Sequence, residues 1–299
     1  MNIFSLLAFT VYAAEAIISP LPDIPLVPPV LKPNVTFGEL TAARVTGQVL
    51  GEATTAAILI TPPLPAVVPL GGTKEGTTRK KNVTIAVLGD SMVDTLGPGV
   101  PHLQSKLAAF FSTTHFNILN YGVGATNAEY GLERLTHDYT YLGNHIASLV
   151  SQHPDMVVVE SFGYNPFSVA EGALDRHWLT MAKIIDVLKG QIPGVKIVIA
   201  ATIAPNAKVF GDGAAGLSFG PIDKWQHVDV IKKYLDSTVR FAQSQHLPLA
   251  NIYNPSLGSD GNGNLAYINP GDHIHYSDAG RELFAQKVTE AIISNHLLE

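Results

Sequence analysis

Apolar and polar residues follow one another in short blocks from about residue 81 to the end of the chain. Five of the apolar blocks are rich in β-branched residues and bounded by Gly, Pro or Asn: residues 83–88, 116–121, 156–160, 196–203 and 247–253. Runs of this length and composition are typical of strands buried on both faces of a parallel sheet. We therefore predict five strands in this part of the chain.

The segments between these runs have the periodicity of amphipathic helices, with apolar residues at spacings of three and four. Three such faces are Leu174, Trp178, Met181, Ile185 and Leu188; Val228, Ile231, Leu235, Val239 and Ala242; and Phe284, Val288, Ala291 and Ile292. Strands that alternate with helices predict an α/β fold, in which helices cover both faces of a parallel sheet. We assign residues 81–299 to one such domain, which is of ordinary size.

The first 80 residues have a different pattern. The apolar run within residues 1–18 is short for a membrane span and ends near Ala14-Glu15-Ala16, which resembles a small-x-small cleavage site. We expect a signal peptide here, and an uncleaved membrane-proximal segment is the alternative. A signal peptide would make the protein an exported one, whether secreted, periplasmic or on the cell surface. Residues 19–80 begin with a proline-laden stretch, which predicts an extended linker or arm.

Composition excludes several classes of function. The formal net charge is -6 and no long basic run occurs, so we expect no nucleic-acid partner. The chain has 0 cysteines, which excludes disulfides, thiolate metal sites and a cysteine nucleophile. Hydrophobic residues make up 46% of the chain, enough for a large core. Contact with a membrane is expected only through the apolar segment at the N-terminus.

A serine follows the first predicted strand. Gly89, Asp90 and Ser91 place it at the carboxyl edge of the sheet, where ligands bind in folds of this class. A strand that ends by delivering a serine into a glycine-bearing turn can present a nucleophile. The same triplet also occurs in ordinary turns, so a catalytic role requires a base, an orienting acid and an oxyanion site elsewhere in the chain.

Two other strand ends carry groups that could stabilise an oxyanion. The second strand leads into residues 120–127, where glycines leave backbone N–H groups uncovered by side chains. A plain strand-to-helix loop is the alternative there. The third strand leads into a constrained turn in which Asn165 precedes Pro166. Its carboxamide could donate a hydrogen bond to an oxyanion, and a purely turn-forming Asn is the alternative.

Residues 269–280, just before the last predicted helix, contain Asp272 and His275. An Asp three positions before a His in a loop can place its carboxylate against one ring nitrogen and leave the other nitrogen to face a nucleophile. His273 and His275 also form an H-x-H pair, but no other ligands cluster with them in the sequence. We therefore expect no metal and no other cofactor.

Taken together, four blocks in this order resemble the SGNH (GDSL-like) hydrolase family. They are Gly89-Asp90-Ser91, Asn120 to Ala125, Gly163-Tyr164-Asn165 and Asp272-His273-Ile274-His275, and the resemblance covers about residues 81–299. It implies a flavodoxin-like, three-layer α/β/α sandwich with a five-stranded, mainly parallel sheet. It also implies hydrolysis of an ester through an acyl-enzyme intermediate.

The resemblance further implies a catalytic triad. Ser91 would be the nucleophile, His275 would take its proton and return one to the leaving alcohol, and Asp272 would orient the imidazole. In this reading Asp90 shapes the turn rather than taking part in the chemistry.

An oxyanion hole is implied as well. Its donors would be the backbone N–H of Ser91, a backbone N–H of Gly124 or Ala125, and the side chain of Asn165. Two positions depart from the family pattern. Ala125 stands where the second block usually has its last Gly, and Pro166 follows Asn165 where an Asp is usual.

These observations favour a serine esterase that acts on O-acetyl or other short-acyl esters, including those of an extracellular carbohydrate. A lipase, thioesterase or arylesterase of the same family with a preference for longer acyl chains is one alternative. The glycine-rich residues 211–220 predict a flexible loop that covers the site and sets this preference. A non-catalytic binding module on the same fold is the alternative from another class, and the departures at Ala125 and Pro166 are its support.

Overall fold

The computed structural model describes residues 80–167 and 171–299. The predicted signal segment, and the predicted linker except for its last residue, lie outside the described residues. Five strands form one sheet in the order β2-β1-β5-β6-β7, and every neighbouring pair is parallel. They are β1 (Asn82–Gly89), β2 (His115–Gly122), β5 (Met156–Glu160), β6 (Lys196–Ala201) and β7 (Leu249–Asn251). The predicted parallel sheet is confirmed, with a shorter last strand than the apolar run suggested.

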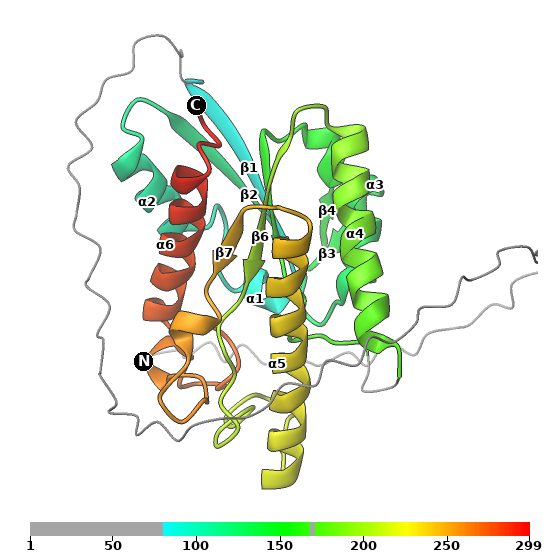
Figure 1. The fold of residues 1–299 in the computed structure, drawn as a ribbon, viewed down its shortest axis with the longest axis vertical. Coiled ribbons are helices and arrows are strands. Elements are labelled where there is room, and N and C mark those ends of the chain that lie inside the picture. Colours follow the sequence, from blue (N-terminus) through cyan, green and yellow to red (C-terminus); the bar gives the residue numbers. More distant parts are fainter. Residues whose placement is uncertain (1–79, 168–170) are drawn as a thin grey trace, which may run out of the picture. The chain divides into compact units, whose positions relative to one another are not determined.

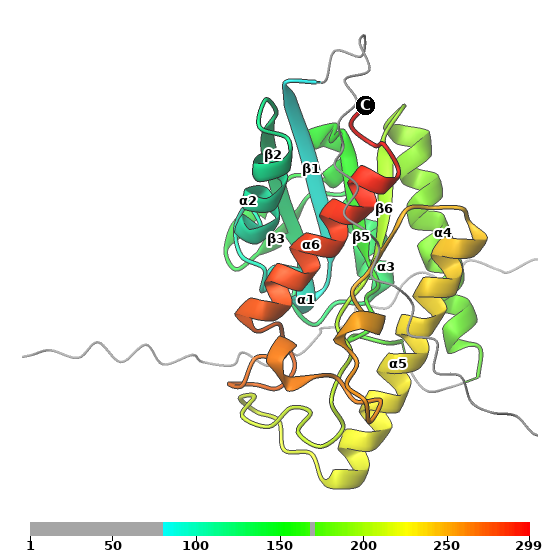
Figure 2. The ribbon, with the colours of Figure 1, turned by 60° about the vertical axis from the view of Figure 1, so that its left-hand side comes forward.

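Helices cover both faces of this sheet (Figure 1). They are α1 (Ser91–Asp94), α2 (Pro101–Phe110), α3 (Ala128–Thr136), α4 (Ala173–Gln191), α5 (Pro221–Ser244) and α6 (Asp278–Ser294), and 3-10 turns span Leu149–Gln152, Asn254–Ser256 and Leu265–Tyr267. Helices α2 and α6 lie on one face and α3 and α4 on the other, as the second view also shows (Figure 2). The three-layer α/β/α sandwich is therefore confirmed.

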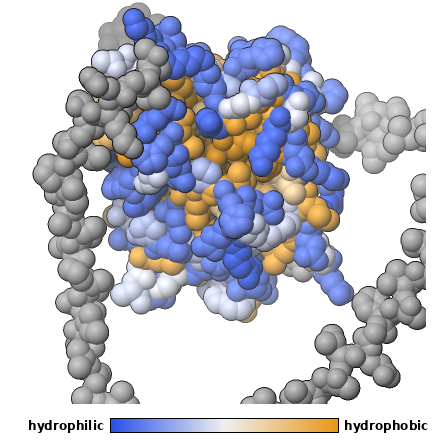
Figure 3. All heavy atoms as spheres, turned by 45° about the horizontal axis from the view of Figure 1, so that its top comes forward, coloured by the Kyte–Doolittle hydropathy of each residue, from blue (hydrophilic) through white to orange (hydrophobic). Residues whose placement is uncertain are grey.

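Alternate residues of β1 contribute to the hydrophobic cores on the two faces of the sheet. Ile85 and Val87 of β1 are buried with the residues of α2 and α6, whereas Ala86 and Leu88 are buried with those of α3 and α4. This division follows from the two-residue period of a strand, which sends successive side chains to opposite faces. Because both faces are apolar, β1 reads as a continuous hydrophobic run in the sequence. On the face shown in Figure 3, hydrophobic residues (orange) lie in the middle and hydrophilic residues (blue) lie on either side of them.

The face of α4 that is buried differs in part from the predicted one. Met181, Ile185 and Leu188 are buried as expected, but Trp178 is only partly buried and His177 is 2% exposed. None of the helices in the described part of the chain is long and apolar enough to cross a membrane.

A two-stranded hairpin was not predicted. Strands β3 (Tyr139–Tyr141) and β4 (Asn144–Ile146) pair in antiparallel fashion between α3 and β5. Leu142 and Gly143 form the two-residue turn, with φ values of 49° and 79°. Two positive φ angles in a row are what a tight hairpin turn requires. Each strand is three residues long and only partly buried, so it carries no apolar run that sequence reasoning could detect.

Candidate active site

The turn between β1 and α1 holds Ser91 at the first position of α1. Asp90 is fully buried and caps this helix, because its Oδ1 accepts a hydrogen bond of 2.8 Å from the Met92 backbone N–H. The backbone N–H of Ser91 donates no hydrogen bond to any described residue. The turn therefore presents both the hydroxyl and the backbone N–H of Ser91 at the carboxyl edge of the sheet.

Asn120 and Gly122, at the end of β2, hold α1 in place. The Asn120 side chain donates hydrogen bonds of 2.9 Å to the backbone carbonyls of Val93 and Gly97, and it accepts one of 2.8 Å from the Gly122 N–H. A Cβ atom on Gly122 would lie 2.1 Å from the backbone nitrogen of Asp94. Only glycine allows this close approach, so the Asn and the first Gly of the second block have a clear structural reason.

Gly124 and Ala125 lie beside the serine. A Cβ built on Gly124 would be 4.0 Å from Ser91 Cβ and 3.1 Å from the hydroxyl of Tyr141. The Gly124 backbone N–H donates to that hydroxyl at 3.1 Å. Ala125 has a φ of 56°, in the left-handed region, and its N–H donates no hydrogen bond within the described ranges. Of the two candidate donors, only the N–H of Ala125 is thus available to a ligand.

Asn165 is held against the same turn. Its Nδ2 donates a hydrogen bond of 2.9 Å to Oδ2 of Asp90, the residue before Ser91. A carboxamide nitrogen carries two hydrogens, and the second has no acceptor among the residues that the structure describes. The departure at Pro166 leaves this arrangement intact, because Asp90 supplies the acceptor that orients the carboxamide.

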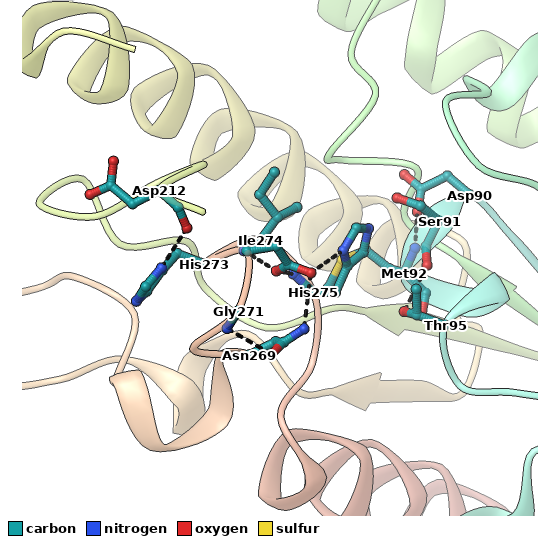
Figure 4. A network of polar contacts seen from close by, with 11 residues as sticks. Asp90, Ser91, Met92, Thr95, Asp212, Asn269, Gly271, His273, Ile274 and His275 are labelled. Carbon is teal, nitrogen blue, oxygen red and sulfur yellow. Dashed lines mark hydrogen bonds and ion pairs between the residues drawn. The ribbon is translucent and has the colours of Figure 1, made fainter. Parts of the chain in front are cut away.

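Asp272 and His275 form a hydrogen-bonded pair in the loop before α6. His275 Nδ1 lies 3.0 Å from Asp272 Oδ2, and Asn269 Nδ2 donates to the same oxygen at 2.9 Å (Figure 4). The other oxygen of Asp272 accepts the backbone N–H groups of Ile274 and His275 at 2.8 and 3.0 Å. Partial burial alone would raise the pKa of Asp272, but these hydrogen bonds bring the pKa below its ordinary value. Asp272 is therefore a carboxylate at neutral pH.

The second ring nitrogen of His275 is buried and has no hydrogen-bond partner in the described part of the chain. Because Nδ1 donates its hydrogen to a carboxylate, the neutral imidazole carries a lone pair on Nε2. In Figure 4 the His275 ring lies on the side of its loop that faces Asp90 and Ser91. Burial raises the pKa of Asp90 above its ordinary value, and the nearby His275 is among the groups that oppose this rise, which is consistent with their proximity. Ser91 and His275 are not hydrogen-bonded to each other in this structure.

Two buried charged residues near the site, Arg134 and Glu160, were not singled out in the sequence. Arg134 is 5% exposed and donates to the carbonyl of Gly89 at 2.9 Å and to the hydroxyl of Thr126 at 3.1 Å. Glu160 is fully buried at the end of β5, and its pKa is raised well above the usual value by burial and then by the charge of Asp90. As the only charged residue in the apolar run 156–160, Glu160 could have been noticed in the sequence, whereas Arg134 has no such signal.

Residues 211–220 contact the loop that carries Asp272. The carbonyl of Asp212 lies 2.7 Å from Nδ1 of His273, and a Cβ on Gly213 would be 2.4 Å from the carbonyl oxygen of Gly271. The glycines at this point thus allow two loops to pack backbone to backbone. His273 is engaged in this contact, and the described residues contain no group of three or more His, Cys, Asp or Glu that could hold a metal ion.

Comparison with known proteins shows similarity in structure only. No family model matches the chain, and no curated protein matches it. Among solved structures, a lipase/acylhydrolase from Enterococcus faecalis superposes with a TM-score of 0.50 at 17% identity, over 71% of this chain and 96% of that one. A protein described as a GDSL-like lipase from Parabacteroides merdae superposes with a TM-score of 0.50 at 16% identity, over 72% and 97% of the two chains. The fold of the chain is therefore that of the GDSL-like hydrolases, as the resemblance implied.

Proposed function

We propose that this protein, which has the fold of the GDSL-like lipases and acylhydrolases, is a serine esterase that hydrolyses carboxylic esters. The observation that carries the proposal is the state of His275. One ring nitrogen is held by the Asp272 carboxylate, and the other presents a buried lone pair on the side of Ser91. This orientation is the one that a general base requires in order to activate a serine hydroxyl.

The reaction begins when Ser91 Oγ attacks the ester carbonyl and passes its proton to Nε2 of His275. The imidazolium that forms is stabilised by Asp272 and then protonates the leaving alkoxide, so that an alcohol departs and an acyl-Ser91 ester remains. A water molecule repeats the sequence with His275 as its base. The carboxylic acid is released, and the Ser91 hydroxyl is restored.

The negative charge on the carbonyl oxygen requires fixed donors in both steps. Ser91 and Ala125 each contribute a backbone N–H that is bound to no described residue, and Asn165 contributes the second hydrogen of its carboxamide. We propose Ala125 rather than Gly124 for the second donor, because the Gly124 N–H is bound to Tyr141.

The test is hydrolysis of p-nitrophenyl acetate by the wild type and by Ser91→Ala. We expect the variant to lose activity by several orders of magnitude, because the members of a triad act as a unit. Full activity in the variant would refute the role of Ser91. An inactive wild type that also fails to react with an organophosphonate would instead favour the non-catalytic binding module.

For the substrate we propose a short-acyl ester, with the O-acetyl groups of an extracellular polysaccharide as one source and small esters as the other. A series of p-nitrophenyl esters from acetyl to decanoyl distinguishes this proposal from a lipase-like preference for long chains. Rates that rise with chain length would contradict it. Export through residues 1–18 is likewise a proposal, and locating the protein by cell fractionation tests it.

A further inference from the structure

The unpredicted β3–β4 hairpin places a tyrosine on the loop that is proposed to bind the oxyanion. The hydroxyl of Tyr141 accepts the Gly124 N–H at 3.1 Å and donates to Oδ2 of Asp94 at 2.8 Å. Asp94 lies on α1, three residues after Ser91. Three segments that are distant in sequence are thus joined at one hydroxyl, beside the nucleophile.

This hydroxyl is well suited to hold the loop. Burial raises the pKa of Tyr141 above its ordinary value, so the group is a neutral phenol that can donate and accept at once. Because the Gly124 N–H is bound on one side, the plane of the peptide between Val123 and Gly124 is fixed. The N–H of Ala125 belongs to the next peptide plane, which is joined to this one at the Cα of Gly124.

Ala125 has a particular need for such a restraint. Its φ of 56° lies in the left-handed region, which glycine adopts freely and which residues with a Cβ avoid. The left-handed state of an alanine is disfavoured by roughly five- to thirty-fold in population. An unrestrained loop with Ala at this position would therefore spend most of its time in another backbone conformation.

We propose that Tyr141, held by Asp94, is a positioning residue that keeps Ala125 in its left-handed conformation and thereby aims the Ala125 N–H at the oxyanion. The inference rests on the proposed function for its catalytic consequence. It explains how the chain can carry Ala where the resembling family has Gly, since the hairpin supplies the restraint that the backbone itself lacks.

The test compares Tyr141→Phe with Tyr139→Phe in the full-length protein. The hydroxyl of Tyr139, on the same hairpin, is buried and has no hydrogen-bond partner within the described ranges, so removing it is a matched control. We expect Tyr141→Phe to lower kcat by about ten- to a hundred-fold with KM nearly unchanged, somewhat less than deletion of an oxyanion donor. Tyr139→Phe should behave like the wild type.

A rescue variant separates positioning from general damage. Adding Ala125→Gly to Tyr141→Phe should restore kcat by about fivefold or more, because glycine adopts the left-handed conformation without a restraint. An unrelated packing defect would not respond to this change. A rise in KM with unchanged kcat would instead make Tyr141 a substrate-binding residue and overturn the proposal.

Hydrogen exchange provides a readout that does not depend on turnover. The Gly124 amide should be protected in the wild type and in Tyr139→Phe, and it should exchange faster in Tyr141→Phe. Unchanged protection in Tyr141→Phe would overturn the inference, as would lost protection with wild-type kcat and KM. Failure of the proposed function is recognised separately, by full activity in Ser91→Ala.

Discussion

The stability of the domain should depend on pH through one buried histidine. His177 lies on α4 at 2% exposure, and its Nε2 is 2.8 Å from the carbonyl oxygen of Ser161, at the start of the turn that ends in Asn165. A carbonyl oxygen can only accept, so Nε2 carries the hydrogen. Nδ1 is buried with no hydrogen-bond partner in the described part of the chain. A proton added there would place a charge in an apolar environment, between the rings of Phe167 and Tyr234.

The size of the effect follows from the pKa. Burial lowers the pKa of His177 from 6.5 to about 4. The unfolded chain binds this proton more readily than the folded one does. The contribution of neutral His177 to the stability of the fold is therefore fully present above pH 6.5, and it is lost as the pH falls toward 4. The loss in unfolding free energy is roughly 2 kcal/mol at about pH 5 and roughly 3 kcal/mol at about pH 4. A domain with a total stability of about 5–15 kcal/mol would be measurably weakened.

The assay is urea unfolding of the wild type and of His177→Gln at about pH 7 and about pH 5. Glutamine keeps a donor for the Ser161 carbonyl and cannot titrate. Glu160 acts in the opposite direction, because its raised pKa makes it destabilising as the pH rises, but it is present in both proteins and cancels in the comparison. We expect the wild type to lose roughly 2 kcal/mol more than the variant on acidification. Parallel pH dependences of the two proteins would show that His177 is not the source of the acid sensitivity.

Three further predictions concern the site. Gly122→Ala should unfold the domain or lower its unfolding free energy by more than about 4 kcal/mol in thermal denaturation, since the new Cβ would lie 2.1 Å from the Asp94 nitrogen. Gly190→Ala is the control, because a Cβ there has no heavy atom within 4 Å, and it should be neutral or stabilising. Equal effects of these two substitutions would contradict the packing. Asp272→Asn should lower kcat by roughly 10³–10⁴-fold at neutral pH with the fold retained, because the imidazole loses its orienting carboxylate, and a small loss in steady-state assays would remove Asp272 from the triad. Asn165→Ala should lower kcat by roughly 10²–10³-fold with KM little changed, and an effect confined to KM would make Asn165 a binding residue.

The sheet could be predicted because strands that are buried on both faces appear in the sequence as continuous hydrophobic runs. Each strand of the main sheet is a short apolar run, so its position and parallel pairing follow from composition and spacing. Ser91 and Asn165 could likewise be expected at one edge of the sheet, since both follow parallel strands that end there. The hydrogen bond from Asn165 to Asp90 shows that these turns are in contact.

Other features of the site depend on long-range contacts that have no local signal. The β3–β4 hairpin is polar and short, so nothing in the sequence distinguishes Tyr141 from an ordinary loop residue. Its hydrogen bonds with Gly124 and Asp94 are evident only in the structure. His177 lies in a helix with other polar residues, and only its packing against Tyr234 and its contact with Ser161 reveal that it is buried. The sequence likewise does not distinguish Gly124 from Ala125 as the second oxyanion donor, because the difference lies in the hydrogen bond from the Gly124 N–H to Tyr141 of the hairpin.

If Ser91 is a nucleophile activated by His275, it should react with an organophosphonate. The experiment is mass spectrometry of the intact protein after this reaction, followed by mapping of the modified peptide. We expect one adduct per chain, located on Ser91 and absent from the Ser91→Ala and His275→Ala variants. An unmodified protein, or an adduct on another residue, would contradict this role of Ser91.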